Sequence, residues 1–129
     1  MKPSLLLLLL PFAIAACARS DSAVADDEDA LARELAGRVA GETRTCVSTS
    51  ALQNLRSIDS RTLAYEKGDT LWISRLRSDC SAVTPYNTLI VEGSTGQYCR
   101  GDRIRALEPG ASIPGPICIL SDWTPYRRR

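Results

Sequence analysis

The stretch RTLAYEKGDTLWISRL, residues 61–76, holds two runs of β-prone residues on either side of Lys67-Gly68-Asp69. A short glycine-containing turn between two such runs is typical of a β-hairpin. We therefore expect two antiparallel strands here, joined at Gly68.

Further along the chain, three more stretches have the composition of strands and are separated by loops rich in glycine and proline. They are TLIVEG (88–93), QYCRGDRIRALE (97–108) and ICILSDW (117–123). Short strands at such spacing are typical of small all-β domains. The sequence thus predicts a mainly β fold, a small antiparallel barrel or sandwich of about five to six strands.

Before the hairpin, the pattern changes to that of a helix. The stretch DEDALARELAGRVAGE (27–42) places Leu31, Leu35 and Val39 on one helical face behind an acidic start. Glycine commonly ends a helix. We expect one short N-terminal helix that stops at Gly41 and packs its apolar stripe on the core.

The first sixteen residues, MKPSLLLLLLPFAIAA, join one positive charge to an apolar run that is too short for a stable membrane span. This pattern is typical of a secretory signal peptide. Residues 14–17, Ile-Ala-Ala-Cys, resemble the bacterial lipobox, whose cysteine is lipidated and becomes the first mature residue. Cleavage by the general signal peptidase, leaving Ala16 or Arg19 first, is the alternative. We expect a signal peptide at 1–16, a lipidated Cys17 with a flexible tether at 17–29, and one domain at 30–129.

The chain has five cysteines, an odd number for an exported protein. If Cys17 carries lipid, four remain, and an oxidising compartment allows them to pair. Two disulfides are expected, with the pairing open on this argument; four buried thiols are the alternative. A metal site is not expected, because the chain has no histidine and no C-x-x-C spacing. The four cysteines are Cys46, Cys80, Cys99 and Cys118.

Residues suited to catalysis are scarce. Without histidine there is no Ser-His or Cys-His arrangement, and the only lysine after signal removal, Lys67, falls in the predicted turn. No glycine-rich phosphate loop occurs, and sixteen basic residues against fifteen acidic ones give no field for nucleic acid. We expect no enzyme, no cofactor and no nucleic-acid partner. Five acids that could pair as in glycosidases are interpreted instead as solvated turn residues: Asp59, Asp79, Asp102, Glu108 and Asp122.

Three local features have a structural interpretation. Arg100-Gly101-Asp102 matches the integrin tripeptide, but is interpreted as a glycine-permitted bulge or turn closed by Asp102. Residues 127–129, all arginine, are interpreted as a solvated basic tail. Trp72 and Trp123 are expected to anchor the core, because large residues are few in this chain.

Three stretches together resemble an uncharacterised family of small exported proteins and lipoproteins from alphaproteobacteria, sphingomonads especially. They are LAGRVAGETRTCVSTSALQNLRSIDSRTLAYEKGDTLWISRLR, YCRGDRIRALE and DWTPYRRR. The resemblance covers residues 35–129, with Tyr98 in place of the usual leucine before Cys99. It implies fold and export but no activity. It also implies pairing of Cys46 with Cys99 and of Cys80 with Cys118.

The function expected from these features is that of a non-catalytic envelope lipoprotein module, structural or interaction-mediating. Ala18, rather than aspartate, after Cys17 favours the periplasmic side of the outer membrane; a soluble periplasmic or secreted form is the alternative. The partners expected are the membrane, through the lipid, and an envelope protein or polymer. The runner-up is a small periplasmic inhibitor of a lysozyme-like or other hydrolase, because STGQY (94–98) loosely resembles a Ser-Gly-x-x-Tyr inhibitory loop. Candidate donors to carboxylate or phosphate are Arg56, Arg61, Arg75, Arg77, Arg103 and Arg105.

Overall fold

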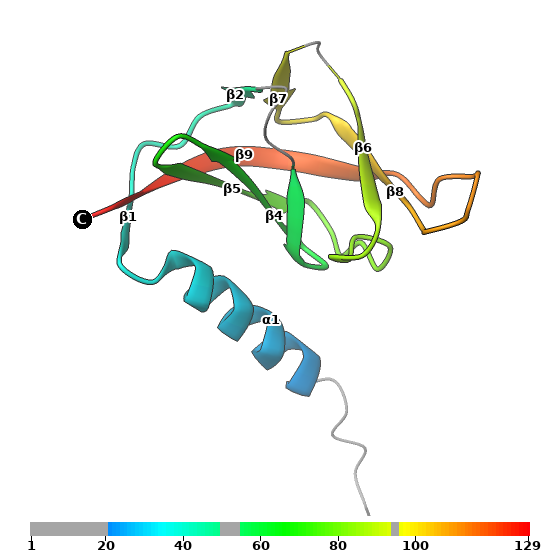
Figure 1. Ribbon diagram of the computed structural model, residues 1–129, viewed down its shortest axis with the longest axis horizontal. Helices are drawn as coiled ribbons and strands as arrows, with labels where there is room; N and C mark the ends of the chain where they lie inside the picture. The colour runs from blue at the N-terminus through cyan, green and yellow to red at the C-terminus, as the bar shows by residue number, and fades with distance from the viewer. Residues whose placement is uncertain (1–20, 50–54, 94–95) are drawn as a thin grey trace, which may run out of the picture.

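A computed structural model of the chain describes residues 21–49, 55–93 and 96–129. In these ranges one helix precedes nine strands, most of which form an antiparallel sheet that curls into half a barrel (Figure 1). The mainly β fold with one helix is confirmed. The elements are α1 (Asp21–Leu35), β1 (Arg38–Ala40), β2 (Cys46–Ser48), β3 (Arg56–Asp59), β4 (Thr62–Lys67), β5 (Thr70–Leu76), β6 (Thr88–Glu92), β7 (Gln97–Cys99), β8 (Arg103–Leu107) and β9 (Cys118–Arg128).

The main sheet has the strand order β3-β4-β5-β9-β8-β6, and β1 pairs with β9 outside this path. Strand β9 pairs with β5 along one side, and with β8 and then β1 along the other. Strands β2 and β7 form a separate antiparallel pair. The last strand of the chain therefore joins the hairpin to the rest of the sheet.

The predicted hairpin is confirmed. Strands β4 and β5 are antiparallel, and Lys67 opposite Thr70 is their last pair before the turn. Gly68 has a φ of +57°, in the left-handed region that favours glycine. A two-residue turn of this kind matches the twist of the two strands, so local sequence is enough to specify it.

The core lies on the concave face of the sheet. Trp123 and Tyr65 are fully buried there, and Tyr98 lies between them. The ring centroids of Tyr98 and Tyr65 are 5.4 Å apart at 87°, and those of Tyr98 and Trp123 are 6.1 Å apart at 27°. Trp72 is also buried, so both tryptophans anchor the core as expected.

Two disulfides link the parts of this fold. Cys46 bonds to Cys99 across the β2–β7 pair, where the two residues are directly opposite. Cys80 bonds to Cys118, which ties the segment after β5 to the start of β9. These are the pairs that the family resemblance implies. Two disulfides are consistent with an oxidising location outside the cytoplasm.

Helix α1 differs from its expected bounds at both ends. It already begins at Asp21, inside the expected tether 17–29, in a stretch where alanine supports helix formation. It ends at Leu35 rather than at Gly41, because Gly37 has a φ of +70°. Among the described residues no helix is long and apolar enough to cross a membrane.

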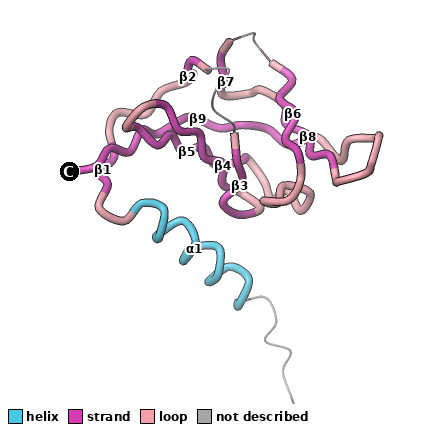
Figure 2. Tube along the Cα trace, in the orientation of Figure 1, coloured by secondary structure: helices cyan, strands magenta, loops and turns pink. Residues whose placement is uncertain are grey.

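The last turns of α1 pack on the outer face of the hairpin, and the helix runs below the sheet in Figures 1 and 2. Leu31 and Leu35 pack there against a second apolar cluster of Ala64, Leu71 and Ile73. Val39, the third residue of the expected stripe, lies instead in β1 and is 46% exposed. The expectation for Val39 is wrong because β1 pairs with β9, and such tertiary pairing overrides local periodicity.

The stretch 97–108 forms two strands with a tight turn between them. The Asp102 N–H donates to the Cys99 carbonyl at 3.1 Å, and the Cys99 N–H donates to the Asp102 carboxylate at 2.8 Å. Gly101 has a φ of +93°. The tripeptide 100–102 is thus a turn closed by Asp102, as expected.

Candidate functional site: an arginine-lined hollow at one end of the sheet

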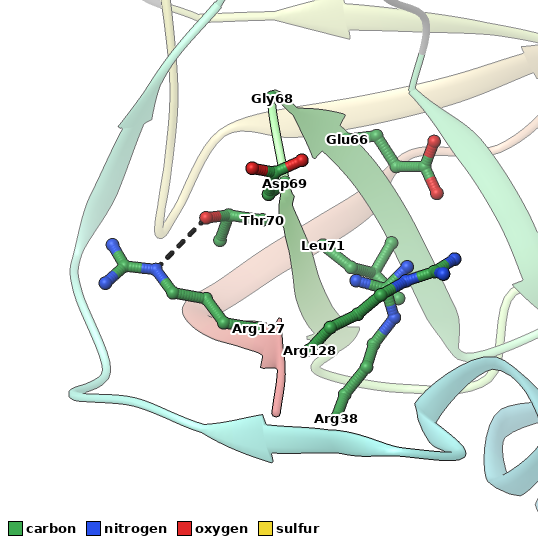
Figure 3. Close-up of a pocket in the computed structure, with 8 residues that line it drawn as sticks. All are labelled: Arg38, Glu66, Gly68, Asp69, Thr70, Leu71, Arg127 and Arg128. Carbon is green, nitrogen blue, oxygen red and sulfur yellow. Dashed lines mark hydrogen bonds between the residues drawn. The ribbon is translucent and has the colours of Figure 1, made fainter.

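A hollow of about 540 Å³ lies where β1, the β4–β5 turn and the end of β9 meet (Figure 3). Three of the residues that line it are arginines from two strands that are far apart in sequence. We call it the arginine hollow. Its lining is Arg38, Glu66, Gly68, Asp69, Thr70, Leu71, Arg127 and Arg128.

Strand register brings two of these arginines together. Arg38 of β1 is directly opposite Arg128 of β9, so the two side chains leave the sheet on the same face. Figure 3 shows both extending toward the Glu66 side of the hollow, while Arg127 extends the other way. The Arg127 Nε donates to Thr70 Oγ1 at 3.2 Å. Like charges in directly opposite positions destabilise a strand pair, so the Arg38–Arg128 pair carries an energetic cost.

Nearby carboxylates offset this cost only in part. In the described part of the chain, no carboxylate oxygen is within 4.0 Å of a guanidinium nitrogen of Arg38, Arg127 or Arg128. Glu66 lines the hollow, but it pairs with Arg56 at 3.8 Å. The hollow therefore keeps cationic groups that no acid of the described residues pairs with directly.

Helix α1 contributes one more acid to this end of the sheet. Arg56 donates two hydrogen bonds to the Glu34 carboxylate, at 2.9 and 2.8 Å. These bonds are the largest cause of a lowered pKa of Glu34 and a raised pKa of Arg56, and the charge of Arg38 lowers the pKa of Glu34 further. Both carboxylates, those of Glu34 and Glu66, thus pair with Arg56, and Arg38 acts on Glu34 only through its charge.

The Glu34–Arg56 pair predicts a pH-dependent attachment of α1. Because the pKa of Glu34 is lowered in the folded state, its stabilisation is present above the ordinary value of 4.5 and is lost as pH falls through the folded value. We expect Glu34→Gln to lower the free energy of unfolding by about 0.5–1 kcal/mol at pH 7, a range set by partial solvent exposure. The difference from the parent protein should shrink in denaturant titrations below pH 4.5.

Glu28→Gln is the matched control, because Glu28 is exposed on the same helix and has no ion pair among the described residues. It should leave stability within about 0.5 kcal/mol at both pH values. If Glu34→Gln lowers the free energy of unfolding by the same amount at pH 7 and at pH 3, the carboxylate charge is not the cause of the lost stability.

Most of the arginines expected to be free donors are already paired. Four of the six have ion pairs, and only Arg75 and Arg77 have none within the described ranges. Residues 127 and 128, expected in a solvated tail, instead belong to β9, where backbone pairing with β5 and β1 holds them. The pairs are Arg56–Glu34 at 2.8 Å, Arg61–Asp79 at 3.0 Å, Arg103–Glu92 at 3.5 Å and Arg105–Glu92 at 3.9 Å.

Of the acids expected to be solvated, Asp79 and Glu108 are exposed, whereas Asp59 is buried, and several of the five make local contacts. Asp59 is buried, and its Oδ1 accepts from the Arg61 N–H at 2.7 Å. Asp79 pairs with Arg61, Asp102 closes its turn, and Asp122 pairs with Arg100 at 3.2 Å. In the described ranges no three cysteine, aspartate or glutamate side chains gather as a metal site would need.

Comparisons of the chain with protein-family models, with curated proteins and with solved structures found no match. The family resemblance over residues 35–129 therefore stays a prediction. Cys17 lies outside the described residues, as do residues 94–95 of the loop that resembles an inhibitory loop. The arginine hollow is the feature of the described residues with the clearest chemistry.

Proposed function

We propose that this protein is an exported, lipid-anchored module of the cell envelope that binds an anionic partner without transforming it. The observation that carries the proposal is the Arg38–Arg128 pair, two guanidinium groups directly opposite with no carboxylate partner within the described residues. A carboxylate or phosphate placed between them would offset their repulsion. The planar fork of arginine donors matches both groups.

The chemistry of the lining favours binding over turnover. A guanidinium group stays protonated in proteins, so it can hold and orient an anion but cannot accept its proton.

The two disulfides suit an oxidising compartment, and the lipobox-like residues 14–17 support an anchor. An inhibitor of a lysozyme-like hydrolase is the alternative function.

Loss of the arginine pair should weaken anion binding. We expect inorganic phosphate or citrate to shift backbone amide NMR signals of β1 and β9, and Arg38→Gln/Arg128→Gln to weaken that binding about tenfold or more. Arg33→Gln is the control, because Arg33 is exposed on α1 and lines neither this hollow nor its neighbour. If the control loses as much affinity as the double variant, or if no anion binds the parent protein, the binding proposal is wrong.

Turnover assays address the non-catalytic part of the proposal. The same preparations would be incubated with peptidoglycan, ester, peptide and phosphate substrates. Activity that follows the purified protein and disappears on changing a single aspartate or glutamate would contradict it. Stoichiometric inhibition of lysozyme would instead support the inhibitor alternative.

The proposed lipid anchoring is tested by determining the N-terminus of the mature protein. Mass spectrometry of membrane-extracted protein is expected to give a mature chain that starts at Cys17 and carries acyl chains, because stable anchoring needs more than one chain. A soluble form that starts at Ala16 or Arg19 would contradict lipid anchoring and leave the binding proposal to be judged on the anion titrations.

A further inference from the structure

A second hollow, of about 430 Å³, lies next to the arginine hollow, and Arg127 lines both. Arg44 adds a further guanidinium group to it, and Val39 adds an exposed apolar side chain, while Trp72 and Pro125 line it from buried positions. We call it the second hollow. Its lining is Val39, Ala40, Gly41, Glu42, Arg44, Trp72, Pro125 and Arg127.

The two hollows open mainly on opposite faces of the same strands and meet at Arg127. Successive side chains of a strand point to opposite faces, so Arg127 and Arg128 of β9 diverge, as Figure 3 shows. Arg44 is held on the Arg127 side by a backbone bridge to Trp123, in which each N–H donates to the other carbonyl at 2.8 Å. Arginines therefore surround the end of the sheet: Arg38 and Arg128 on one face, and Arg44 and Arg127 on the other.

We propose that a linear acidic polysaccharide crosses this end of the sheet and occupies both hollows. The inference rests on the proposed function and names its partner class. A small anion can occupy one hollow only, and a single exposed ion pair contributes little. A chain with a charge on each repeat reaches both faces, since its second contact forms at a high effective concentration.

The arrangement of the arginines favours a sugar polymer over an acidic peptide. A bound peptide commonly adds a strand along one free sheet edge and uses backbone hydrogen bonds. Here the cations lie instead on both faces around the strand ends. The second hollow also offers the exposed Val39 beside Arg127, an apolar side chain on which the C–H face of a sugar ring can pack.

Two acids line the hollows and should repel an acidic polymer. Their replacement should therefore strengthen polymer binding, whereas replacement of the arginines should weaken it. Asp69 lines the arginine hollow and Glu42 lines the second hollow, and neither has an ion pair among the described residues. Each should repel an acidic chain. Asp69→Asn and Glu42→Gln are therefore expected to tighten polysaccharide binding about twofold or more.

The experiment compares a galacturonate dimer with a galacturonate chain of about ten units, by calorimetry on the full mature protein at low salt. We expect the chain to bind about tenfold or more tightly than the dimer. Arg44→Gln should lower the affinity for the chain about threefold or more and leave that for the dimer within about twofold, because Arg44 lines the second hollow but not the arginine hollow. Arg33→Gln should change neither affinity, and circular dichroism would verify that each variant is folded.

Two results would overturn the inference. Equal affinity for dimer and chain would show that one face suffices. An oligoglutamate of the same charge and length that binds as tightly as galacturonate would indicate an acidic polypeptide partner. Since phosphate or citrate binding is measured separately, failure of all anions refutes the proposed function, whereas small-anion binding without a length effect refutes only the polysaccharide.

Discussion

Replacing Trp123 with alanine is expected to lower the free energy of unfolding by about 4 kcal/mol, the typical cost of removing a large buried aromatic side chain. Trp123 is fully buried in β9, and its ring stacks on Tyr98 with centroids 6.1 Å apart. Its Nε1 is buried without a hydrogen-bond partner in the described residues, so truncation leaves no polar group unpaired. The whole cost then comes from lost packing and from the cavity. Urea titration followed by far-ultraviolet circular dichroism would measure it.

Tyr86→Ala is the matched aromatic control, because Tyr86 is 85% exposed. It should change stability by no more than about 0.5 kcal/mol. Trp123→Phe keeps an aromatic ring and should cost less than alanine, which keeps the comparison usable if Trp123→Ala does not fold. A loss below about 1 kcal/mol for Trp123→Ala would mean that the core is not centred on this residue.

The parts of the fold that follow from local sequence could be predicted. The β4–β5 hairpin needs only β-prone runs and a glycine at the turn, and both are within one stretch of sixteen residues, 61–76. The burial of Trp72 and Trp123 follows from their size in a chain with few other large residues. These features depend on neighbouring residues or on residue type alone.

Strand β1 could not be predicted in the same way. Residues 38–40 continue the helical spacing of Leu31 and Leu35, and glycines at 37 and 41 are both plausible helix ends by sequence. What selects Gly37 is pairing of the next residues with β9, at the far end of the chain. No local pattern reports a contact of such long sequence separation.

The arginine hollow depends on the same long-range pairing. The sequence predicts that arginines provide the binding chemistry, but the six that it favours are others, and four of these pair with acids. Arg38 falls within the predicted helical stretch 27–42, and Arg127 and Arg128 fall within the predicted tail 127–129. Their convergence follows from the register of β1 on β9, which residue type and spacing do not reveal.

The second large effect is expected from removal of the disulfide between Cys80 and Cys118. The bond closes a loop of sequence separation 38, and chain entropy alone predicts a stabilisation of about 4 kcal/mol, mainly by restricting the unfolded chain. Both residues are buried, 2% and 6% exposed, so their replacement by alanine also removes packing. We expect Cys80→Ala/Cys118→Ala to lower strongly the urea concentration at which half of the protein is unfolded. The molecules that remain folded should keep the far-ultraviolet circular dichroism spectrum of the β-sheet.

Cys46→Ala/Cys99→Ala separates the entropic effect from burial. Its loop is longer, with a separation of 53, so chain entropy again predicts about 4 kcal/mol. Cys46 and Cys99 are only partly buried, so mild dithiothreitol should reduce their bond first, and mass mapping of alkylated peptides would show the order. If the Cys80–Cys118 bond opens first, burial does not protect it from reduction. If its removal costs less than about 1 kcal/mol, the entropic and packing losses cannot both be real, and the segment after β5 must be held on β9 by contacts other than this bond.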